Sequence, residues 1–98
     1  MTYVVRLTPE AEDTFDALSK QLLSRWGEQY VLEFEDRVSK AFELLSQTPF
    51  IYPVVLDELQ VRKCVIHKNC SIFYKIFGQT VVVICFSDNR QDPIFFDE

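Results

Sequence analysis

The spacing of apolar residues changes once along this 98-residue chain, from a helical period to a strand period, and the change follows Pro53. Apolar residues recur every three or four positions over residues 9–26 and 28–47, which predicts two amphipathic helices. From residue 60 onward they recur at every second position, which predicts strands. A chain with this order is expected to pack a helical layer on a separate sheet layer, because each apolar face needs the other to cover it.

The two predicted helices meet at Gly27. Thr8 is a typical N-cap and Pro9 suits the first helical position, so the first helix is expected to begin there. The second is expected to end before Pro49, because a proline inside a helix removes a hydrogen bond and clashes with the preceding turn. A single residue between two helices of this length predicts an antiparallel helix hairpin. Residues 3–7 form a short β-rich run, which we expect to join the sheet as an added strand.

Three strands are predicted in the second half of the chain, at residues 61–66, 70–77 and 80–87. Their connections are short, so they are expected to form an antiparallel meander. Residues 48–53 contain two prolines and are interpreted as a linker from the helical layer to the sheet. The predicted fold is a single α+β domain over residues 1–98: a two-layer sandwich, β-α-α-β-β-β, with an antiparallel sheet packed on the helix hairpin.

The strand at residues 70–77 carries two sets of side chains, because strand side chains alternate between the two faces. One set is apolar and is expected to face the helices: Ile72, Tyr74 and Ile76. The other set includes polar residues and is expected to face water: Ser71, Phe73 and Lys75. This interpretation makes Phe73 an exposed aromatic residue on the open sheet face. It places Tyr74 in the core with its hydroxyl at an edge.

Charge divides the chain into an acidic first half and a mildly basic second half. The whole chain has 10 Lys and Arg residues against 15 Asp and Glu, a net charge of −5. Residues 1–48 hold nine acidic and five basic residues, whereas residues 59–96 hold five basic and two acidic ones. The negative balance argues against direct, specific nucleic-acid binding by the chain alone. The longest apolar run, residues 81–86, is too short to span a membrane, and no signal peptide is visible, so we expect a cytoplasmic protein.

The three cysteines, Cys64, Cys70 and Cys85, all lie in or beside strand-like apolar runs. Their number is odd and they form no CxxC pair, so they are interpreted as buried, reduced thiols. His67 is the only histidine, and a zinc site built from Cys64, His67 and Cys70 would need a fourth ligand. We therefore expect no metal and no cofactor, and we interpret His67 as a solvated residue in a turn.

Seven short motifs occur in an order and spacing that cover nearly the whole chain. They are residues 5–12 (VRLTPEAE), Trp26-Gly27, Pro49 with Tyr52-Pro53, Val61-Arg62-Lys63, residues 73–76 (FYKI), 81–84 (VVVI) and 90–93 (RQDP). With these motifs the chain resembles the RelE/ParE superfamily of toxins from bacterial type II toxin–antitoxin systems, on its ParE-like branch. The resemblance implies the same β-α-α-β-β-β fold and a toxin of the plasmid-stabilisation kind.

The resemblance implies one of two activities. RelE-like members are metal-free endoribonucleases that cleave mRNA on the ribosome, whereas ParE-like members bind and inhibit DNA gyrase. The nucleases have an arginine where this chain has Ser71, and a C-terminal tyrosine that is absent here. We therefore expect a gyrase inhibitor rather than an enzyme. The alternatives are a RelE-like nuclease, with Arg62, His67 and Arg90 as catalytic candidates, and a non-toxic relative that only binds an antitoxin.

Inhibition by binding requires aromatic and arginine anchors on a surface rather than a catalytic group. The candidates for target binding are Arg62, Phe73, Lys75, Arg90, Ile94, Phe95 and Phe96. The resemblance also implies a cognate antitoxin with an extended tail. We expect this tail to add to an exposed strand edge, to cover the helix hairpin and to lay apolar residues into a groove beside it.

Overall fold

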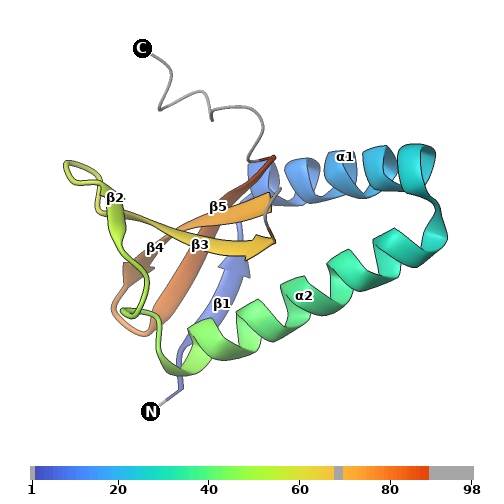
Figure 1. The fold of residues 1–98 in the computed structure, drawn as a ribbon. Helices are drawn as coiled ribbons and strands as arrows, with labels where there is room; N and C mark the ends of the chain where they lie inside the picture. The colour runs from blue at the N-terminus through green and yellow to red at the C-terminus, as the bar shows by residue number, and fades with distance from the viewer. Residues whose placement is uncertain (1, 68–69, 89–98) are drawn as a thin grey trace.

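A computed structural model describes residues 2–67 and 70–88 of the chain. Its elements follow in the order β1 (Val4–Leu7), α1 (Pro9–Trp26), α2 (Glu28–Gln47), β2 (Val54–Leu56), β3 (Val61–His67), β4 (Cys70–Phe77) and β5 (Thr80–Asp88). The two helices form one layer and the strands form another (Figure 1). This two-layer α+β arrangement confirms the fold class predicted from the sequence.

Both helices have the bounds that the sequence predicts. α1 begins after Thr8, whose Oγ1 accepts a hydrogen bond from the Ala11 N–H at 3.0 Å and donates one to the Ile84 carbonyl at 2.8 Å. The second bond joins the start of the helix to β5. α1 ends at Gly27, whose φ of +98° is one that glycine adopts without steric cost. Neither helix in the described part of the chain is long and apolar enough to cross a membrane.

The sheet has the strand order β1-β5-β4-β3-β2, and β3, β4 and β5 form the predicted antiparallel meander. Two features differ from the prediction. β1 pairs with β5 in parallel, with Val4 opposite Thr80 and Leu7 opposite Val83, so the sheet is mixed. Residues 54–56 add an edge strand beside β3. Three residues are too few to show a strand period in a sequence. The helix hairpin separates β1 from the meander, so no short turn sets the direction of β1.

The main core lies between the helices and the sheet. At its centre the ring centroid of Phe15 is 5.4 Å from that of Phe34 on α2 and 5.4 Å from that of Phe86 on β5. Ile72 and Tyr74 of β4 are fully buried in this core, as the alternation predicts. Aromatic side chains from both helices and from the sheet therefore hold the two layers together.

The predicted exposure of Phe73 and Ser71 is wrong, because both residues are fully buried. Phe73 belongs to a second, smaller apolar cluster on the sheet face away from the helices. This cluster consists of Val61, Phe73 and Cys85, with Leu56 and Ile84 packed against it. Leu56 comes from β2, which the sequence did not reveal, and Ile84 lies where the register between β4 and β5 shifts by one residue. Simple alternation along β4 does not predict either contribution.

Candidate protein-binding site

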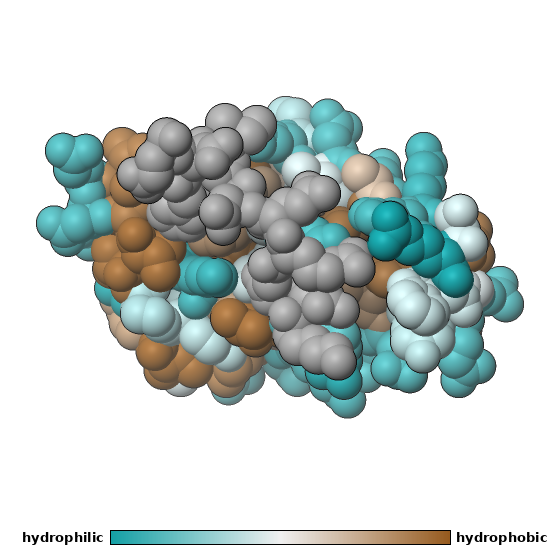
Figure 2. Space-filling view, turned by 45° about the horizontal axis from the view of Figure 1, so that its top comes forward, coloured by the Kyte–Doolittle hydropathy of each residue, from teal (hydrophilic) through white to brown (hydrophobic). Residues whose placement is uncertain are grey.

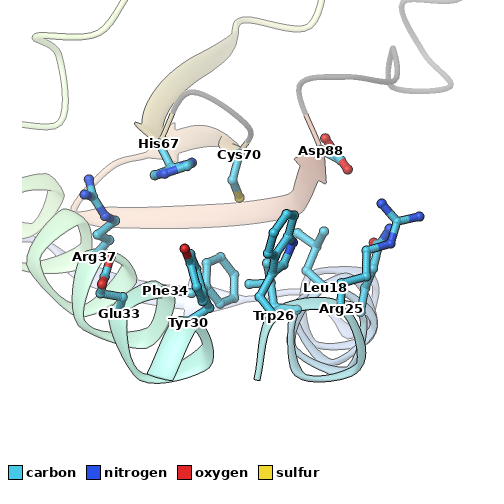
Figure 3. Close-up of a pocket in the computed structure, with 12 residues that line it drawn as sticks. Leu18, Arg25, Trp26, Tyr30, Glu33, Phe34, Arg37, His67, Cys70 and Asp88 are labelled. Carbon is cyan, nitrogen blue, oxygen red and sulfur yellow. The ribbon is translucent and has the colours of Figure 1, made fainter. Parts of the chain in front are cut away.

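A pocket of about 410 Å³ opens between the two helices and the sheet, near the turn of the helix hairpin (Figure 3). Figure 1 shows that the hairpin extends beyond the ends of the strands. α1 and α2 form one wall, and the ends of β3, β4 and β5 form the other. We call it the hairpin pocket. It is lined by Leu18, Gln21, Leu22, Arg25, Trp26, Tyr30, Glu33, Phe34, Arg37, His67, Cys70 and Asp88.

Two aromatic residues stand at the mouth of the hairpin pocket. Trp26, at the end of α1, is 57 % exposed, and Tyr30, in the first turn of α2, is 50 % exposed. Their ring centroids are 5.6 Å apart. Both rings point toward the sheet, beside the buried Phe34 (Figure 3). Large apolar side chains that gather at one place and stay half open to water are typical of a surface that binds a partner.

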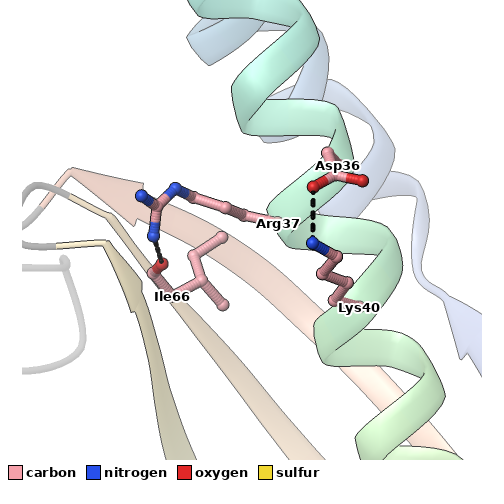
Figure 4. Close-up of polar contacts among 4 residues, drawn as sticks. All are labelled: Asp36, Arg37, Lys40 and Ile66. Atoms are coloured by element: carbon pink, nitrogen blue, oxygen red, sulfur yellow. Dashed lines mark hydrogen bonds and ion pairs between the residues drawn. The ribbon is translucent and has the colours of Figure 1, made fainter.

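Charged side chains border this apolar pocket. Arg25 of α1 and Arg37 of α2 lie at opposite ends of it (Figure 3). Arg37 also donates a hydrogen bond from Nη1 to the Ile66 carbonyl at 3.3 Å, which connects α2 to the end of β3 (Figure 4). The ion pair Asp36–Lys40, 3.0 Å long, is exposed on α2 and contributes little to stability. An apolar groove with charged ends suits an amphipathic peptide segment.

Arg62 lies near the other end of β3, and the chain itself uses its guanidinium group. Nη1 of Arg62 donates hydrogen bonds to the carbonyls of Phe50 (3.3 Å) and Tyr52 (2.5 Å). The guanidinium carbon lies 5.1 Å from the centroid of the Phe50 ring. These contacts hold the segment between α2 and β2. The structure thus gives Arg62 a structural role, and its use in target binding or catalysis stays a prediction.

His67 is the last residue of β3 and lines the hairpin pocket (Figure 3). It therefore lies at the end of a strand rather than in a turn. Five residues along the strand separate it from Arg62, which corresponds to about 17 Å at 3.3 Å per residue. A metal-free nuclease needs its base and its cations around one phosphodiester group. The structure does not bring Arg62 and His67 together in this way, and Arg90, the third candidate, lies outside the described residues.

Two lysines lie over aromatic rings on the sheet face away from the helices. Lys63 Nζ is 5.8 Å from the ring centroid of the buried Phe73, and Lys75 Nζ is 5.1 Å from that of Phe77. Phe73 is therefore no exposed anchor for a target, whereas Lys75 lies beside an exposed aromatic residue. The remaining candidates for target binding lie outside the described residues: Arg90, Ile94, Phe95 and Phe96.

The three cysteines are free and buried, which confirms the interpretation of them as buried thiols. Burial raises the pKa of Cys70 to about 12 and that of Cys85 to about 11, and it also raises the pKa of Cys64. All three thiols are therefore protonated and unreactive at neutral pH. Within residues 2–67 and 70–88, no group of three or more His, Cys, Asp and Glu side chains is placed to hold a metal ion.

The sequence predicts a groove beside the hairpin but does not identify what lines it. Trp26 and Tyr30 fit the apolar spacing of the two helices, so the pattern assigns them to the buried faces. The one sequence signal that could have identified them as pocket residues was their position on either side of Gly27. Residues beside the turn of a helix hairpin lie at the end of the helical layer, where the strands of a shorter sheet do not cover them.

Comparison with known proteins identifies a family model that matches the sequence and solved structures that share the fold. A family model for the ParE toxin of the type II toxin–antitoxin system parDE matches residues 5–93. A structure from the chromosomal ParDE system of P. aeruginosa is similar, with a TM-score of 0.74 and 14% identity over 89% of this chain and 96% of that one. The toxin–antitoxin complex RelBE2 of Mycobacterium tuberculosis matches with a TM-score of 0.61 and 24% identity, over 90% and 99% of the two chains.

A conserved hypothetical protein of Helicobacter pylori is also similar, with a TM-score of 0.61 and 16% identity over 93% of this chain and 98% of that one. No curated protein matches the chain in sequence. At these identities the solved structures show a shared fold alone, whereas the family model spans most of the chain and includes its first strand–helix junction. The chain therefore belongs to the ParE toxins of type II toxin–antitoxin systems, within the wider ParE/RelE family.

Proposed function

We propose that this toxin acts in the cytoplasm by binding and inhibiting DNA gyrase, and that it does not cut RNA. The observation that carries the proposal is the sheet face away from the helices. In the described part of the chain, this face carries the apolar cluster of Val61, Phe73 and Cys85, and two of its cations, Lys63 and Lys75, lie over aromatic rings. RNA cleavage without a metal needs a base and cations at one phosphodiester. Inhibition by binding needs only a complementary surface.

The order of events in growing cells tests this proposal. Expression of the chain without an antitoxin is expected to arrest growth and to induce the DNA damage response before protein synthesis falls. An early fall in protein synthesis, with discrete mRNA cleavage in the ribosomal A site, would contradict it. The residues to substitute would then be Arg62, His67 and Arg90. Growth without any arrest would favour a relative that only binds an antitoxin.

We further propose that a cognate antitoxin neutralises the toxin by occupying the hairpin pocket. The similar structures from ParDE and RelBE toxin–antitoxin systems support a partner of this class. Trp26 and Tyr30 offer exposed aromatic surface, and Arg25 and Arg37 lie at the two ends of the pocket. An amphipathic antitoxin segment with a central apolar face and charged side chains toward its ends fits this arrangement, since Glu33 and Asp88 line the same pocket as the two arginines.

Substitutions in the hairpin pocket test the antitoxin proposal. We expect Trp26→Ser and Tyr30→Ser each to weaken antitoxin binding about 10- to 100-fold, since buried aromatic anchors dominate the binding energy of protein interfaces. Phe50→Ser is the matched control, because Phe50 is 58 % exposed but lies outside the pocket. Titration calorimetry of each purified variant against the antitoxin measures the effect. If Trp26→Ser and Tyr30→Ser bind the antitoxin no more weakly than the Phe50→Ser control, the antitoxin binds elsewhere.

A further inference from the structure

The sheet face away from the helices has an exposed region where β1 begins and β4 turns into β5, at one end of the sheet (Figure 1). Two rows of side chains cross three strands there. One row contains Val4, Thr80 and Phe77, and the other contains Arg6, Val82 and Lys75. Their sequence neighbours Val5, Ile76 and Val81 pack in the main core, so alternation turns these six residues away from the helices. We call them the sheet-end patch.

The sheet-end patch combines exposed apolar surface with positive charge. Phe77 is 57 % exposed and Val4 is 52 % exposed, and Arg6 is exposed as well. Lys75 Nζ lies 5.1 Å from the ring centroid of Phe77. Two strand spacings separate the backbones of Arg6 and Lys75, which amounts to about 10 Å. Figure 2 shows apolar residues gathered at the left of the molecule, on the side that carries β2 in Figure 1.

The charge of the patch is opposite to that of the whole chain. The patch contains two cationic residues and no carboxylate, whereas the chain has a net charge of −5. The one ion pair within residues 2–67 and 70–88 joins Asp36 to Lys40 on α2. Neither Arg6 nor Lys75 therefore has a carboxylate partner among these residues. A cation beside an exposed aromatic ring, with a second cation two strands away, is complementary to an apolar side chain flanked by carboxylates.

We propose that the sheet-end patch is the surface on which this toxin docks an acidic protein partner, which under the proposed function is DNA gyrase. An apolar side chain of the partner packs on Phe77 and Val4, and carboxylates beside it pair with Arg6 and Lys75. Aromatic and arginine side chains supply much of the binding energy of protein interfaces. Six residues cover less than one side of a standard interface, so the patch anchors a larger contact.

A protein fits the patch better than a nucleic acid does. A nucleic acid carries a phosphate at every nucleotide, and a protein binds it through many cations at once. This chain offers only two cations on the patch, which are too few to hold a long polyanion. A folded protein partner presents a local group of carboxylates, which two cations are enough to match.

The sheet-end patch is separate from the hairpin pocket. β5 begins at Thr80 in the patch and ends at Asp88 in the pocket, and this run of strand is about 26 Å long. The pocket lies on the helix side of the sheet, and the patch lies on the other side. Antitoxin affinity is therefore a measure of correct folding that the patch itself does not influence.

A charge reversal with a matched control tests the inference. The test variant is Arg6→Glu with Lys75→Glu, and the control is Lys20→Glu with Lys40→Glu, which changes the net charge equally on exposed helix positions. We expect the test variant to bind purified gyrase about 10- to 100-fold more weakly and to lose growth arrest, with antitoxin affinity and thermal midpoint unchanged. Binding by the wild-type chain is expected to weaken with salt more steeply than binding by the test variant.

Three results would overturn the inference. The test variant could bind gyrase and arrest growth as the control does. It could lose antitoxin affinity together with activity. The wild-type chain could bind a fluorescent single-stranded oligonucleotide that the test variant does not bind, which would assign the patch to nucleic acid.

The inference rests on the proposed function, but growth arrest separates the two. If the wild-type chain does not bind gyrase, the proposed function fails, and the patch is then judged by growth arrest alone. Arrest that the test variant loses and the control keeps supports a docking surface for another acidic protein. Arrest that both variants keep, or a wild-type chain that causes no arrest, contradicts it.

Discussion

Replacing Tyr74 by phenylalanine separates a structural role of its hydroxyl group from a catalytic one. Tyr74 is fully buried in the main core, and its Oη donates a hydrogen bond of 2.7 Å to the carbonyl of Pro49. This bond joins β4 to the segment that follows α2, and the side chain of Pro49 is itself fully buried. Burial also raises the pKa of Tyr74, so the hydroxyl remains a donor at neutral pH.

The expected cost follows from what the substitution leaves behind. Phenylalanine fills the same space, so the packing of the core is retained and no cavity forms. The Pro49 carbonyl loses its donor in a place that excludes water, and such an unsatisfied group costs about 1–3 kcal/mol. For a domain of this size, each kcal/mol lowers the thermal midpoint by about 4–8 °C. We therefore expect a fall of about 4–24 °C.

Thermal unfolding of the antitoxin-free chain, followed by circular dichroism, measures this effect. Tyr30→Phe is the control, because Tyr30 is half exposed and its change is expected to stay within about 0.5 kcal/mol of zero. Tyr74→Phe is also expected to arrest growth as the wild-type chain does at temperatures well below its midpoint. An unchanged midpoint would refute the structural role, and loss of arrest in a folded variant would show that the hydroxyl acts in the toxic activity itself.

Three further predictions concern a helix cap, the buried thiols and the C-terminus. Thr8→Ala is expected to cost about 1–2 kcal/mol in urea unfolding, because it removes both the cap of α1 and the bond to Ile84, and a Thr8→Ser variant that is equally unstable would contradict this. The pKa of Cys85 is raised from 9.0 to about 11, so the folded state holds the proton more tightly. The contribution of Cys85 to stability is thus fully present below pH 9 and falls by up to about 1.4 kcal/mol per pH unit between pH 9 and about 11. Urea titrations measure the total slope, which Cys85→Ala should reduce. Removal of residues 94–98 is expected to abolish gyrase inhibition with an unchanged thermal midpoint, and a collapsed midpoint would instead place those residues in the core.

The helices could be predicted to the residue because their signals are local. Thr8 and Pro9 mark the start of α1, Gly27 marks the break, and the apolar spacing is regular between them. Each of these signals depends on the geometry of a single helix turn, which neighbouring layers do not alter. The meander was also predictable, since short turns connect strands that alternate regularly.

The wrong prediction for Phe73 shows that local sequence signals do not predict burial by residues of other strands. Its neighbours Ser71 and Lys75 are polar, which suggests a face open to water, yet Phe73 is covered by residues from other strands. One of them, Leu56, belongs to a strand of three residues, and another, Ile84, reaches the cluster through a register shift. Both are consequences of the assembled sheet, so alternation along one strand could not reveal them.

The hairpin pocket and the sheet-end patch depend in the same way on the assembly of the fold. Trp26 and Tyr30 lie half open to water at the mouth of the hairpin pocket, where the helices extend beyond the strands. Arg6 and Lys75 are far apart in sequence, and they lie in one row across the sheet because β1 pairs with β5 in parallel. The resemblance of the chain to a toxin family implied partners, but only the arrangement of the strands and helices locates the surfaces that could receive them.

The most direct test of the central claim is a supercoiling assay with purified DNA gyrase. The toxin is added in increasing amounts to gyrase and relaxed plasmid, with and without its antitoxin. We expect supercoiling to be inhibited in proportion to the toxin and to be restored by the antitoxin. Undiminished supercoiling, with cleavage of mRNA when the same preparation is added to translating ribosomes, would contradict a toxin that acts by binding gyrase.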